Sequence, residues 1–431
     1  MSFKEFQPYP KYKDSGVEWL GEIPEHWEVK RLKYSLRLLT EKTDRHEHSV
    51  ALENIESWSG RLIKTETEYE GDGVAFRKDD ILFGKLRPYL AKVYLAESVG
   101  EAVGDFHVMR PSSTIDGSFA QYQILNRDFI AFVDSSTFGA KMPRASWDFM
   151  GNMALLTPLI EEQLSIASFL DRETSRIDTL ISEKERLISL LQEYRQALIS
   201  QSVTKGLDPK VKMKDSGVEW LGEIPEHWEV LKLKYLATIC GGGTPSKLKQ
   251  EFWEGDIPWV SPKDLKGNAI DDTEDHITKE AVLESSTQII PSQTVLIVVR
   301  SGILQHTIPI AINTVPVALN QDMKAILFNE LINPLYFLYL VTGLTSLLLL
   351  EWRKKGPTVE SIESEYLSNA FIPVPPMFEQ NSIAATLLEK TSRIDTLISE
   401  SRRFIDLLTE YRSSLITAAI TGKIDIRGYH V

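Results

Sequence analysis

Cysteine is nearly absent from this chain of 431 residues, since Cys240 is the only one. A single cysteine can form neither an intrachain disulfide nor a multi-cysteine metal site, and it suits a reducing compartment. The first residues contain no apolar run of the kind that marks a signal peptide. Together these features predict a cytoplasmic protein.

Common catalytic motifs are also lacking. The sequence contains no HExxH, no GxSxG, no CxxC and no GxGxxG after a strand-like run. Asp79 and Asp80, together with Lys85, could suggest a metal-dependent nuclease, but the two acids flank a strand-like run in an ordinary way. We therefore expect no active site, no bound cofactor and no metal in this chain.

One apolar stretch, Leu331–Leu350, has twenty residues without a charged side chain. That length could span a bilayer. Pro334 and Gly343 interrupt it, however, and suit the start and the break of short helices. We expect one or two buried helices here and no contact with a membrane.

An internal repeat is the most informative feature that is present. The seventeen residues Lys13–Val29 recur without a change at Lys214–Val230, and Thr174–Glu183 recurs at Thr391–Glu400. The residues between these matching segments, about 130 in each half, do not agree. A constant frame around two different centres favours one scaffold that presents two different recognition modules.

Each half ends in a segment typical of a long helix, at residues 159–204 and 376–421. A run of 46 residues would form a helix about 69 Å long. Apolar side chains recur at steps of seven, four and three, which predicts a narrow apolar seam. The seam residues expected are Leu180, Leu187, Leu191, Tyr194 and Leu198, and in the second copy Leu397, Phe404, Leu408, Tyr411 and Leu415. We expect the two helices to pair with each other; the alternative is that each packs separately on its own module.

The centres of the two halves mix strand-like runs, such as Ile81–Leu86 and Thr294–Val299, with helical patterns, which predicts α+β domains. The predicted fold is therefore α+β: two globular recognition domains separated by two long antiparallel coiled-coil helices, related by a pseudo-two-fold internal repeat. The expected divisions are residues 1–158 for domain 1, 159–206 for spacer helix 1, 207–375 for domain 2 and 376–431 for spacer helix 2.

The net charge of −13 is unfavourable for a protein that binds nucleic acid, but it is unevenly placed. The two seventeen-residue copies and the two helical segments together carry −12 of it. The remaining chain, which includes both differing modules, is nearly neutral. The acidity thus belongs to the frame and leaves the modules free to present local basic patches to phosphate.

The seventeen-residue copies contain acids and tryptophans that are candidates for binding a partner. They are Glu18, Trp19, Glu22, Glu25 and Trp27, and their counterparts Glu219, Trp220, Glu223, Glu226 and Trp228. Two identical surfaces on one chain are what binding two copies of one partner would require. The alternative is a strap that packs on its own module, which would account for the tryptophans but less well for the identical acids.

Loops of the differing modules combine basic, hydroxyl and amide groups, which suit guanine edges, adenine edges and phosphates. The candidates for contact with DNA in the first module are Lys85, Arg87, Tyr89, Lys141 and Arg144. Those in the second are Arg300, Ser301, Gln305, His306, Arg353, Lys354, Lys355 and Thr358. Taken singly, each is more often a solvated surface residue.

Three phrases of this sequence resemble those of specificity subunits of type I restriction–modification systems. They are DSGVEWLGEIPEHWEV (14–29), GGGTPS…FWEGDIPWVSPKDL (241–265) and IPVPPMFEQ…I (372–383). The resemblance extends over nearly the whole length. The first half departs from it at TPLIEEQLSI (157–166), and no GTPS-like opening precedes its module.

The resemblance implies two target-recognition domains joined by antiparallel helices, each reading one half of a split, asymmetric sequence of double-stranded DNA. It implies two methyltransferase subunits docked on this chain, and restriction subunits that join for cleavage. S-adenosylmethionine, ATP and magnesium would be used by those partners and not here, so the chain would not itself be an enzyme. The alternative function is a scaffold that bridges two copies of a protein partner without reading DNA.

Overall fold

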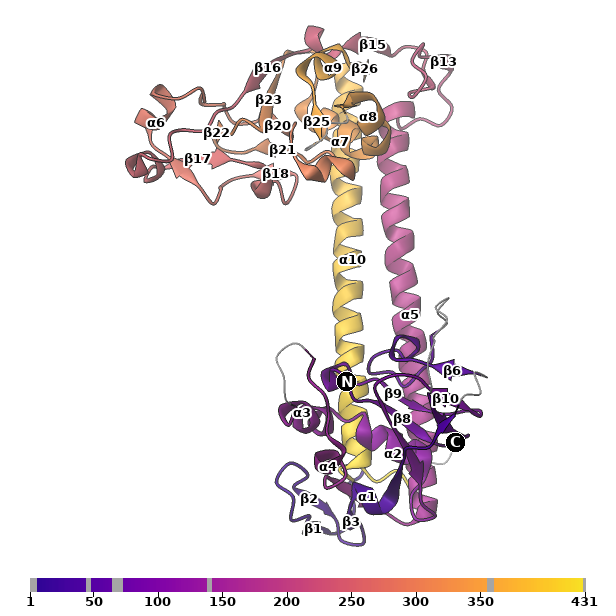
Figure 1. Cartoon of the computed structure of the whole chain (residues 1–431). Helices are drawn as coiled ribbons and strands as arrows, with labels where there is room; N and C mark the ends of the chain where they lie inside the picture. Colours follow the sequence, from indigo (N-terminus) through magenta and orange to yellow (C-terminus); the bar gives the residue numbers. More distant parts are fainter. Residues whose placement is uncertain (1–5, 44–47, 64–72, 138–141, 355–359, 429–431) are drawn as a thin grey trace. The chain divides into compact units, whose positions relative to one another are not determined.

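The computed structural model describes residues 6–43, 48–63, 73–137, 142–354 and 360–428. They form two compact units, unit 1 (Met1–Glu185 with Arg402–Val431) and unit 2 (Arg186–Ser401). Each unit contains β-sheets, short helices and a stretch of two long helices, α5 and α10 (Figure 1). The predicted α+β class is therefore confirmed. The units differ from the contiguous domains expected from the sequence, because the end of the chain belongs to the first unit.

Unit 1 is built on two four-stranded sheets. The sheet with the longer strands is antiparallel throughout and has the order β4 (Leu36–Leu39), β11 (Phe106–Pro111), β8 (Ile81–Gly84) and β9 (Val93–Leu95). The other has the order β5 (Lys42–Thr43), β7 (Gly73–Phe76), β10 (Gly100–Ala102) and β6 (Ser49–Val50). All four residues of β8 are buried, as expected of a short continuous apolar run.

Short elements complete unit 1. Two ribbons pair β1 (Tyr12–Asp14) with β2 (Glu22–Pro24), and β3 (Glu28–Arg31) with β12 (Ala154–Thr157). The short helices are α1 (Leu32–Ser35), α2 (Gly117–Ile124), α3 (Arg127–Ser135) and α4 (Trp147–Met150). Asp116 and Asn126 cap α2 and α3 because their side chains accept hydrogen bonds from backbone N–H groups of the first turn.

Unit 2 has a five-stranded sheet with the order β16 (Ala237–Gly241), β23 (Met323–Phe328), β20 (Val295–Val298), β21 (Ile310–Asn313) and β18 (Ala269–Ile270). A second sheet has the order β19 (His276–Ile277), β17 (Ile257–Val260) and β22 (Ala318–Leu319). Ribbons pair β13 (Met213–Asp215) with β14 (Glu223–Pro225), β15 (Glu229–Lys232) with β26 (Phe371–Val374), and β24 (Arg353–Lys354) with β25 (Ser361–Ile362). The short helices are α6 (Lys279–Leu283), α7 (Pro334–Gly343), α8 (Thr345–Trp352) and α9 (Ser364–Asn369).

The apolar stretch 331–350 forms α7 and most of α8. Residues Tyr336–Val341 of α7 are buried in the core of unit 2, as expected from the Pro and Gly that interrupt the stretch. Among the described residues, no single helix has the length and apolar character needed to cross a membrane. The α7–α8 pair reaches that length and composition only jointly, with a bend of 87° between them.

The long helices α5 (Ile160–Lys205) and α10 (Met377–Ile420) contain 46 and 44 residues. Each begins in one unit and ends in the other. Gly206 and Gly422 follow them with φ values of 73° and 69°, the left-handed conformation that ends helices and that glycine adopts without strain. Both helices therefore begin and end close to where the sequence predicts.

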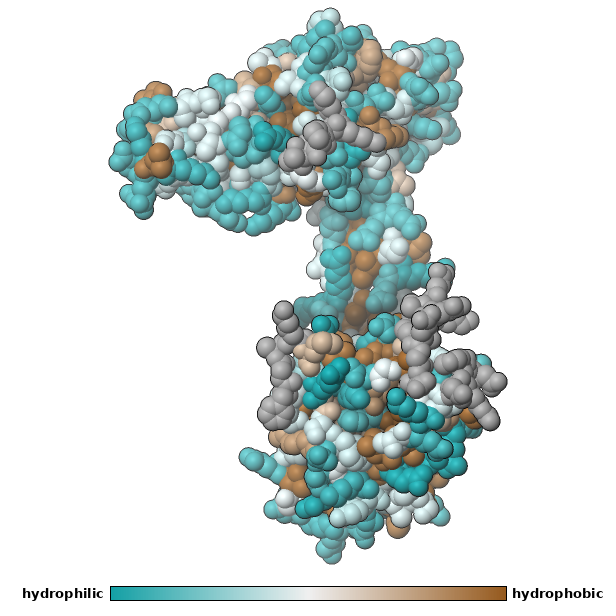
Figure 2. All heavy atoms as spheres, viewed as in Figure 1, coloured by the Kyte–Doolittle hydropathy of each residue, from teal (hydrophilic) through white to brown (hydrophobic). Residues whose placement is uncertain are grey.

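The two helices run antiparallel within each unit. In unit 1, Lys184 lies over the Phe404 ring and Asp178 pairs with Arg412, so a step forward in α5 corresponds to a step back in α10. In unit 2, Arg195 pairs with Asp395. Figure 2 shows hydrophobic side chains along the exposed stretch of the helices.

The prediction of which residues lie in the seam is confirmed at some positions and wrong at others. The least exposed residues recur at alternating steps of four and three, at Ile177, Ile181, Lys184, Ile188, Leu191, Arg195 and Leu198, and again 217 residues later. Leu191, Leu198, Leu408 and Leu415 thus lie in the seam, whereas Leu187, Tyr194, Leu397 and Phe404 are exposed beside it. Isoleucine occupies several of the seam positions that were expected to hold leucine or an aromatic residue. Arginine can occupy a seam position because it pairs with an aspartate on the other helix.

Candidate nucleic-acid interface

In unit 1, the structure brings together basic residues from two loops at the end of β8. Lys85 follows β8 directly, and Arg144 is bridged to the neighbouring Leu86. Asp105 lies between the two cations: its Oδ1 is 3.6 Å from Lys85 Nζ, and its Oδ2 accepts hydrogen bonds from Arg144 Nε (3.2 Å) and Nη2 (2.9 Å). Arg87 is exposed beside them.

Backbone contacts hold these two loops firmly. The N–H of Arg87 donates to the carbonyl of Pro143 (2.9 Å), and the N–H of Ala145 donates to the carbonyl of Lys85 (2.8 Å). The buried His107 places Nε2 3.0 Å from the Ala145 carbonyl, and its burial lowers the pKa of the imidazole. Arg87 itself has a φ of 52°, a strained value for a non-glycine residue.

Tyr89 is half exposed and lines a cavity of about 570 Å³ in unit 1. Trp58 lies on the same cavity and has a φ of 64°, an outlier for a bulky residue. No motif in the sequence singled out Trp58. Trp58 and Tyr89 thus present two partly exposed aromatic side chains on one cavity, and such side chains can stack on a flat ring or pack against an apolar group.

In unit 2, Arg300 is exposed at the end of β20, with Nε 3.7 Å from Asp322 Oδ1. Ser301 caps the short 3-10 helix that follows by accepting a hydrogen bond from the N–H of Ile303. Gln305 and His306 are exposed at the end of that helix. These four candidates therefore lie within one surface segment.

Arg353 differs from these candidates because its side chain is engaged within unit 2. Its side chain is only 18% exposed, its Nε lies 3.7 Å from Glu360 Oε2, and Nη1 donates to the Leu304 carbonyl. Arg353 therefore braces unit 2 from within. Lys354 ends β24, while Lys141, Lys355 and Thr358 lie outside the described residues.

The repeated segments form matching contacts with the first turn of each long helix. In unit 1, Trp27 Nε1 donates to Glu162 Oε1 (3.2 Å), and His26 Nε2 lies 2.9 Å from Glu162 Oε2. In unit 2, Trp228 and His227 make the same two contacts with Glu379, at 3.0 and 2.8 Å. Both copies thus dock on a glutamate at the start of a helix.

Trp27 and Trp228 have no exposed surface, so the prediction that they contact a partner was wrong. Their indole rings fill the cores of the two units, which is the strap alternative for these residues. The acids of the repeat are different: Glu18, Glu22, Glu25, Glu219, Glu223 and Glu226 are all exposed. Glu25 and Glu226 form surface ion pairs with Lys11 and Lys212, and Trp19 and Trp220 are partly buried.

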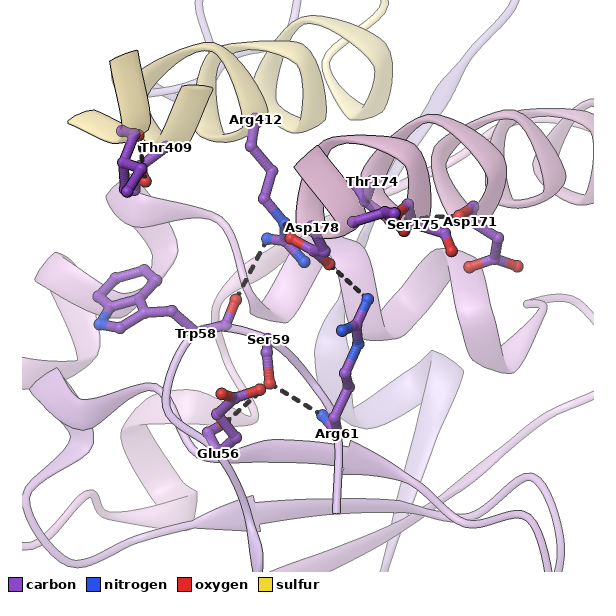
Figure 3. Close-up of polar contacts among 12 residues, drawn as sticks. Glu56, Trp58, Ser59, Arg61, Asp171, Thr174, Ser175, Asp178, Thr409 and Arg412 are labelled. Atoms are coloured by element: carbon purple, nitrogen blue, oxygen red, sulfur yellow. Dashed lines mark hydrogen bonds and ion pairs between the residues drawn. The ribbon is translucent and has the colours of Figure 1, made fainter. Parts of the chain in front are cut away.

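An ion pair between the long helices is also repeated. Arg412 Nε donates to Asp178 Oδ1 at 2.9 Å in unit 1, and Arg195 Nε donates to Asp395 Oδ1 at the same distance in unit 2. Figure 3 shows that Asp178 also receives Arg61 from the loop of module one, and that Arg412 reaches the Trp58 carbonyl. Each residue of one pair is 217 positions from its counterpart in the other.

Comparisons with known proteins agree with this frame. Residues 225–401 match the family described as the type I restriction modification DNA specificity domain. The Escherichia coli "Type I restriction enzyme EcoR124I/EcoR124II specificity subunit" is 39% identical over 241 residues, covering 55% of this chain and 54% of that protein. A putative Methanocaldococcus jannaschii MjaX specificity subunit is 25% identical over 438 residues, covering 95% and 96%.

This chain is therefore similar to type I specificity subunits over most of its length. Two solved structures share its fold. One, from a study of assembly and conformational transition of the type I R-M system, has a TM-score of 0.73 at 17% identity and covers 92% of this chain and 98% of its own. The other, the HsdS subunit from Thermoanaerobacter tengcongensis, has a TM-score of 0.57 at 18% identity and covers 93% and 98%. The chain spans only about half the length of the E. coli relative.

The repeated frame contains further residues that the sequence patterns did not single out. Gln163 and Gln380, next to the docking glutamates, are completely buried. Each accepts a hydrogen bond from a module backbone N–H, of Asp116 or of Asn333, and donates to two backbone carbonyls. The Glu-Gln dipeptide recurs at the 217-residue offset, and that recurrence could have identified both residues.

A further matched pair ties each module of the specificity-subunit fold to its helix. Tyr122 lies 3.2 Å from Thr174 through their hydroxyl oxygens, and Tyr339 lies 3.3 Å from Thr391. Burial raises the pKa of both tyrosines. Among the described residues, no cluster of three or more His, Cys, Asp or Glu side chains is arranged to hold a metal ion.

Proposed function

We propose that this chain is the sequence-specific DNA-binding subunit of a type I restriction–modification complex. It reads a bipartite, asymmetric DNA site with one module for each half. It carries no active site, and catalysis belongs to the subunits that dock on it.

The observation that carries this proposal is a frame of matching contacts around two modules that differ. Glu162 and Glu379 each contact a histidine and a tryptophan at equivalent positions of the repeat. Asp178 and Asp395 each pair with an arginine at equivalent positions of the long helices. The modules that this frame holds have different sheets and different exposed polar side chains. A symmetric frame with unlike readers fits a non-palindromic target, because each half-site meets a different surface.

The proposed partners follow from the repeated acidic surface. Glu18, Glu22, Glu219 and Glu223 are exposed and identical in the two copies, so two copies of one protein with a complementary basic surface can bind. We assign this role to two methyltransferase subunits, with restriction subunits joining them. S-adenosylmethionine, ATP and magnesium are then cofactors of those subunits, and the complex works in the cytoplasm.

The deciding experiment is to express the chain with its neighbouring methyltransferase and to map the modified bases by sequencing. We expect one split, asymmetric motif that disappears when this chain is omitted. Methylation without a motif, or a motif that persists without this chain, would contradict the proposal.

The second candidate is a scaffold that bridges two protein partners through the repeated acidic surface. It is supported by the same exposed glutamates and predicts no sequence-selective DNA binding in the presence of the methyltransferase. A competition assay with random-sequence DNA distinguishes the two, since only a DNA reader keeps its affinity for one sequence class.

A further inference from the structure

Four arginines in the described part of the chain pair with an aspartate through two hydrogen bonds. They differ in the exposed fraction of the arginine side chain. Arg195 and Arg110 are 23% and 25% exposed, and Arg110 is paired with the buried Asp80. Arg144 is 54% exposed although it donates twice to Asp105. Arg427 is 45% exposed, but its partner Asp425 lies two residues away and both belong to the C-terminal segment. The Arg144 side chain is thus fixed by Asp105 and still more than half exposed, and it lies beside other basic residues.

The donors that remain on Arg144 are defined by the geometry of the pair. A guanidinium has five N–H groups, and Asp105 Oδ2 takes one from Nε and one from Nη2. Both N–H groups of Nη1 and one of Nη2 are left, and they form the outer edge of the planar fork. That edge matches the O6 and N7 acceptors of guanine in the major groove.

The position of this edge is fixed before any ligand arrives. The backbone of Arg144 bridges to Leu86, the next residue donates to the Lys85 carbonyl, and His107 lies against the same loop. Asp105 limits rotation of the side chain itself. A pre-organised arginine loses less conformational entropy on binding than a free one.

The charge of the pair argues for a base rather than a phosphate as its ligand. Asp105 neutralises much of the positive charge of Arg144, so the pair gains little from the negative DNA backbone. Directional hydrogen bonds to a base edge do not depend on net charge in this way. Arg87, which is exposed two residues after Lys85, is the better phosphate contact.

We propose that Arg144, oriented by Asp105, reads a guanine in the half-site recognised by module one. This inference rests on the proposed function, and it adds the base that one residue selects. Lys85, 3.6 Å from the other oxygen of Asp105, keeps that carboxylate paired when DNA is bound.

The test uses the full chain in complex with its methyltransferase, comparing the variants R144A, R144K and D105N with R87A. The readouts are the methylation motif and the dissociation constant for cognate DNA at several salt concentrations. R144A should weaken cognate binding by about 5- to 150-fold and make one G·C position of one half-site degenerate. R144K keeps the charge and should lose the same base preference, while D105N should weaken it.

R87A serves as the matched control because it removes a cation from the same surface. It should weaken binding to all sequences alike, lower the salt slope by about one and leave the motif unchanged. Unchanged reading of the other half-site by R144A shows that the variant is folded.

Two failures can be told apart. A wild-type complex without any motif overturns the proposed function, and this inference with it. A wild-type motif whose G·C preferences all survive in R144A and R144K overturns the guanine assignment alone.

Discussion

Arg412 and Asp178 join the two long helices of unit 1 through a hydrogen bond of 2.9 Å from Nε to Oδ1, and both side chains are largely buried. The counterpart of this pair, Arg195 with Asp395, has the same length, but its aspartate is 52% exposed. The same bond is therefore placed in two different environments. Removal of one partner from a pair that is shielded from water costs more than removal from an exposed pair, because the remaining charge stays buried without compensation.

We therefore expect R412A to destabilise the chain more than R195A. R412A leaves Asp178 with the exposed Arg61 as its remaining cation, which predicts a loss of about 1–3 kcal/mol, against less than about 1 kcal/mol for R195A. Urea unfolding of both variants measures the difference. Equal losses would show that burial does not distinguish the two pairs.

Removal of the docking glutamates should also affect the two units unequally. Glu162 accepts hydrogen bonds from Tyr9 and Trp27 and contacts His26, whereas Glu379 contacts only Trp228 and His227 among the described side chains. We predict that E162A costs about 2–4 kcal/mol and E379A about 1–2 kcal/mol, since each leaves buried donors without an acceptor. Thermal unfolding tests this order, and a larger loss in E379A would contradict it.

The glycines that end the helices allow strain and crowding to be separated. A Cβ on Gly422 would lie 2.4 Å from Pro24, a Cβ on Gly206 would lie 3.3 Å from the Trp228 ring, and one on Gly16 would meet nothing within 4 Å. All three residues have a φ near +70°. G16A should therefore show the conformational cost alone, about 1 kcal/mol, with G206A intermediate and G422A largest. Unfolding free energies that rank otherwise would exclude crowding as the cause.

The exposed acids of the repeat give a prediction about stoichiometry. Charge reversal of Glu18 in one copy or Glu219 in the other should weaken one docking site only, and the double variant should weaken both. Native mass spectrometry at moderate salt should then show one methyltransferase on each single variant and none on the double variant. Two bound copies on the double variant would place the docking surface elsewhere.

The long helices predict how the spacing of the half-sites is set. Deletion of seven residues from the middle of both α5 and α10 keeps the phase of the seam and shortens each helix by about 10 Å. We expect the spacer of the methylated motif to become shorter while the half-sites stay the same. A motif with an unchanged spacer would rule out the helices as the element that sets it.

The length and the ends of both helices could be predicted, because the repeat and the terminal glycines encode them. The phase of the seam could not, since Arg195 and Arg412 occupy seam positions through their aspartate partners, which a count of apolar residues does not consider. The same limit explains Arg353, which resembles a surface cation in the sequence but turns inward to Glu360. Trp27 was misassigned because an invariant repeat conserves core and surface residues equally.

Tyr122 with Thr174, and Tyr339 with Thr391, have one consequence beyond the stability of each module. Their threonines, like the Glu-Gln pairs, lie in the long helix that follows each variable module, so the frame presents the same groups to both modules. A gene segment exchanged between the repeats would therefore place a new module against the same groups of the frame. Such an exchange at the repeats would replace one module and leave the frame and the other module unchanged.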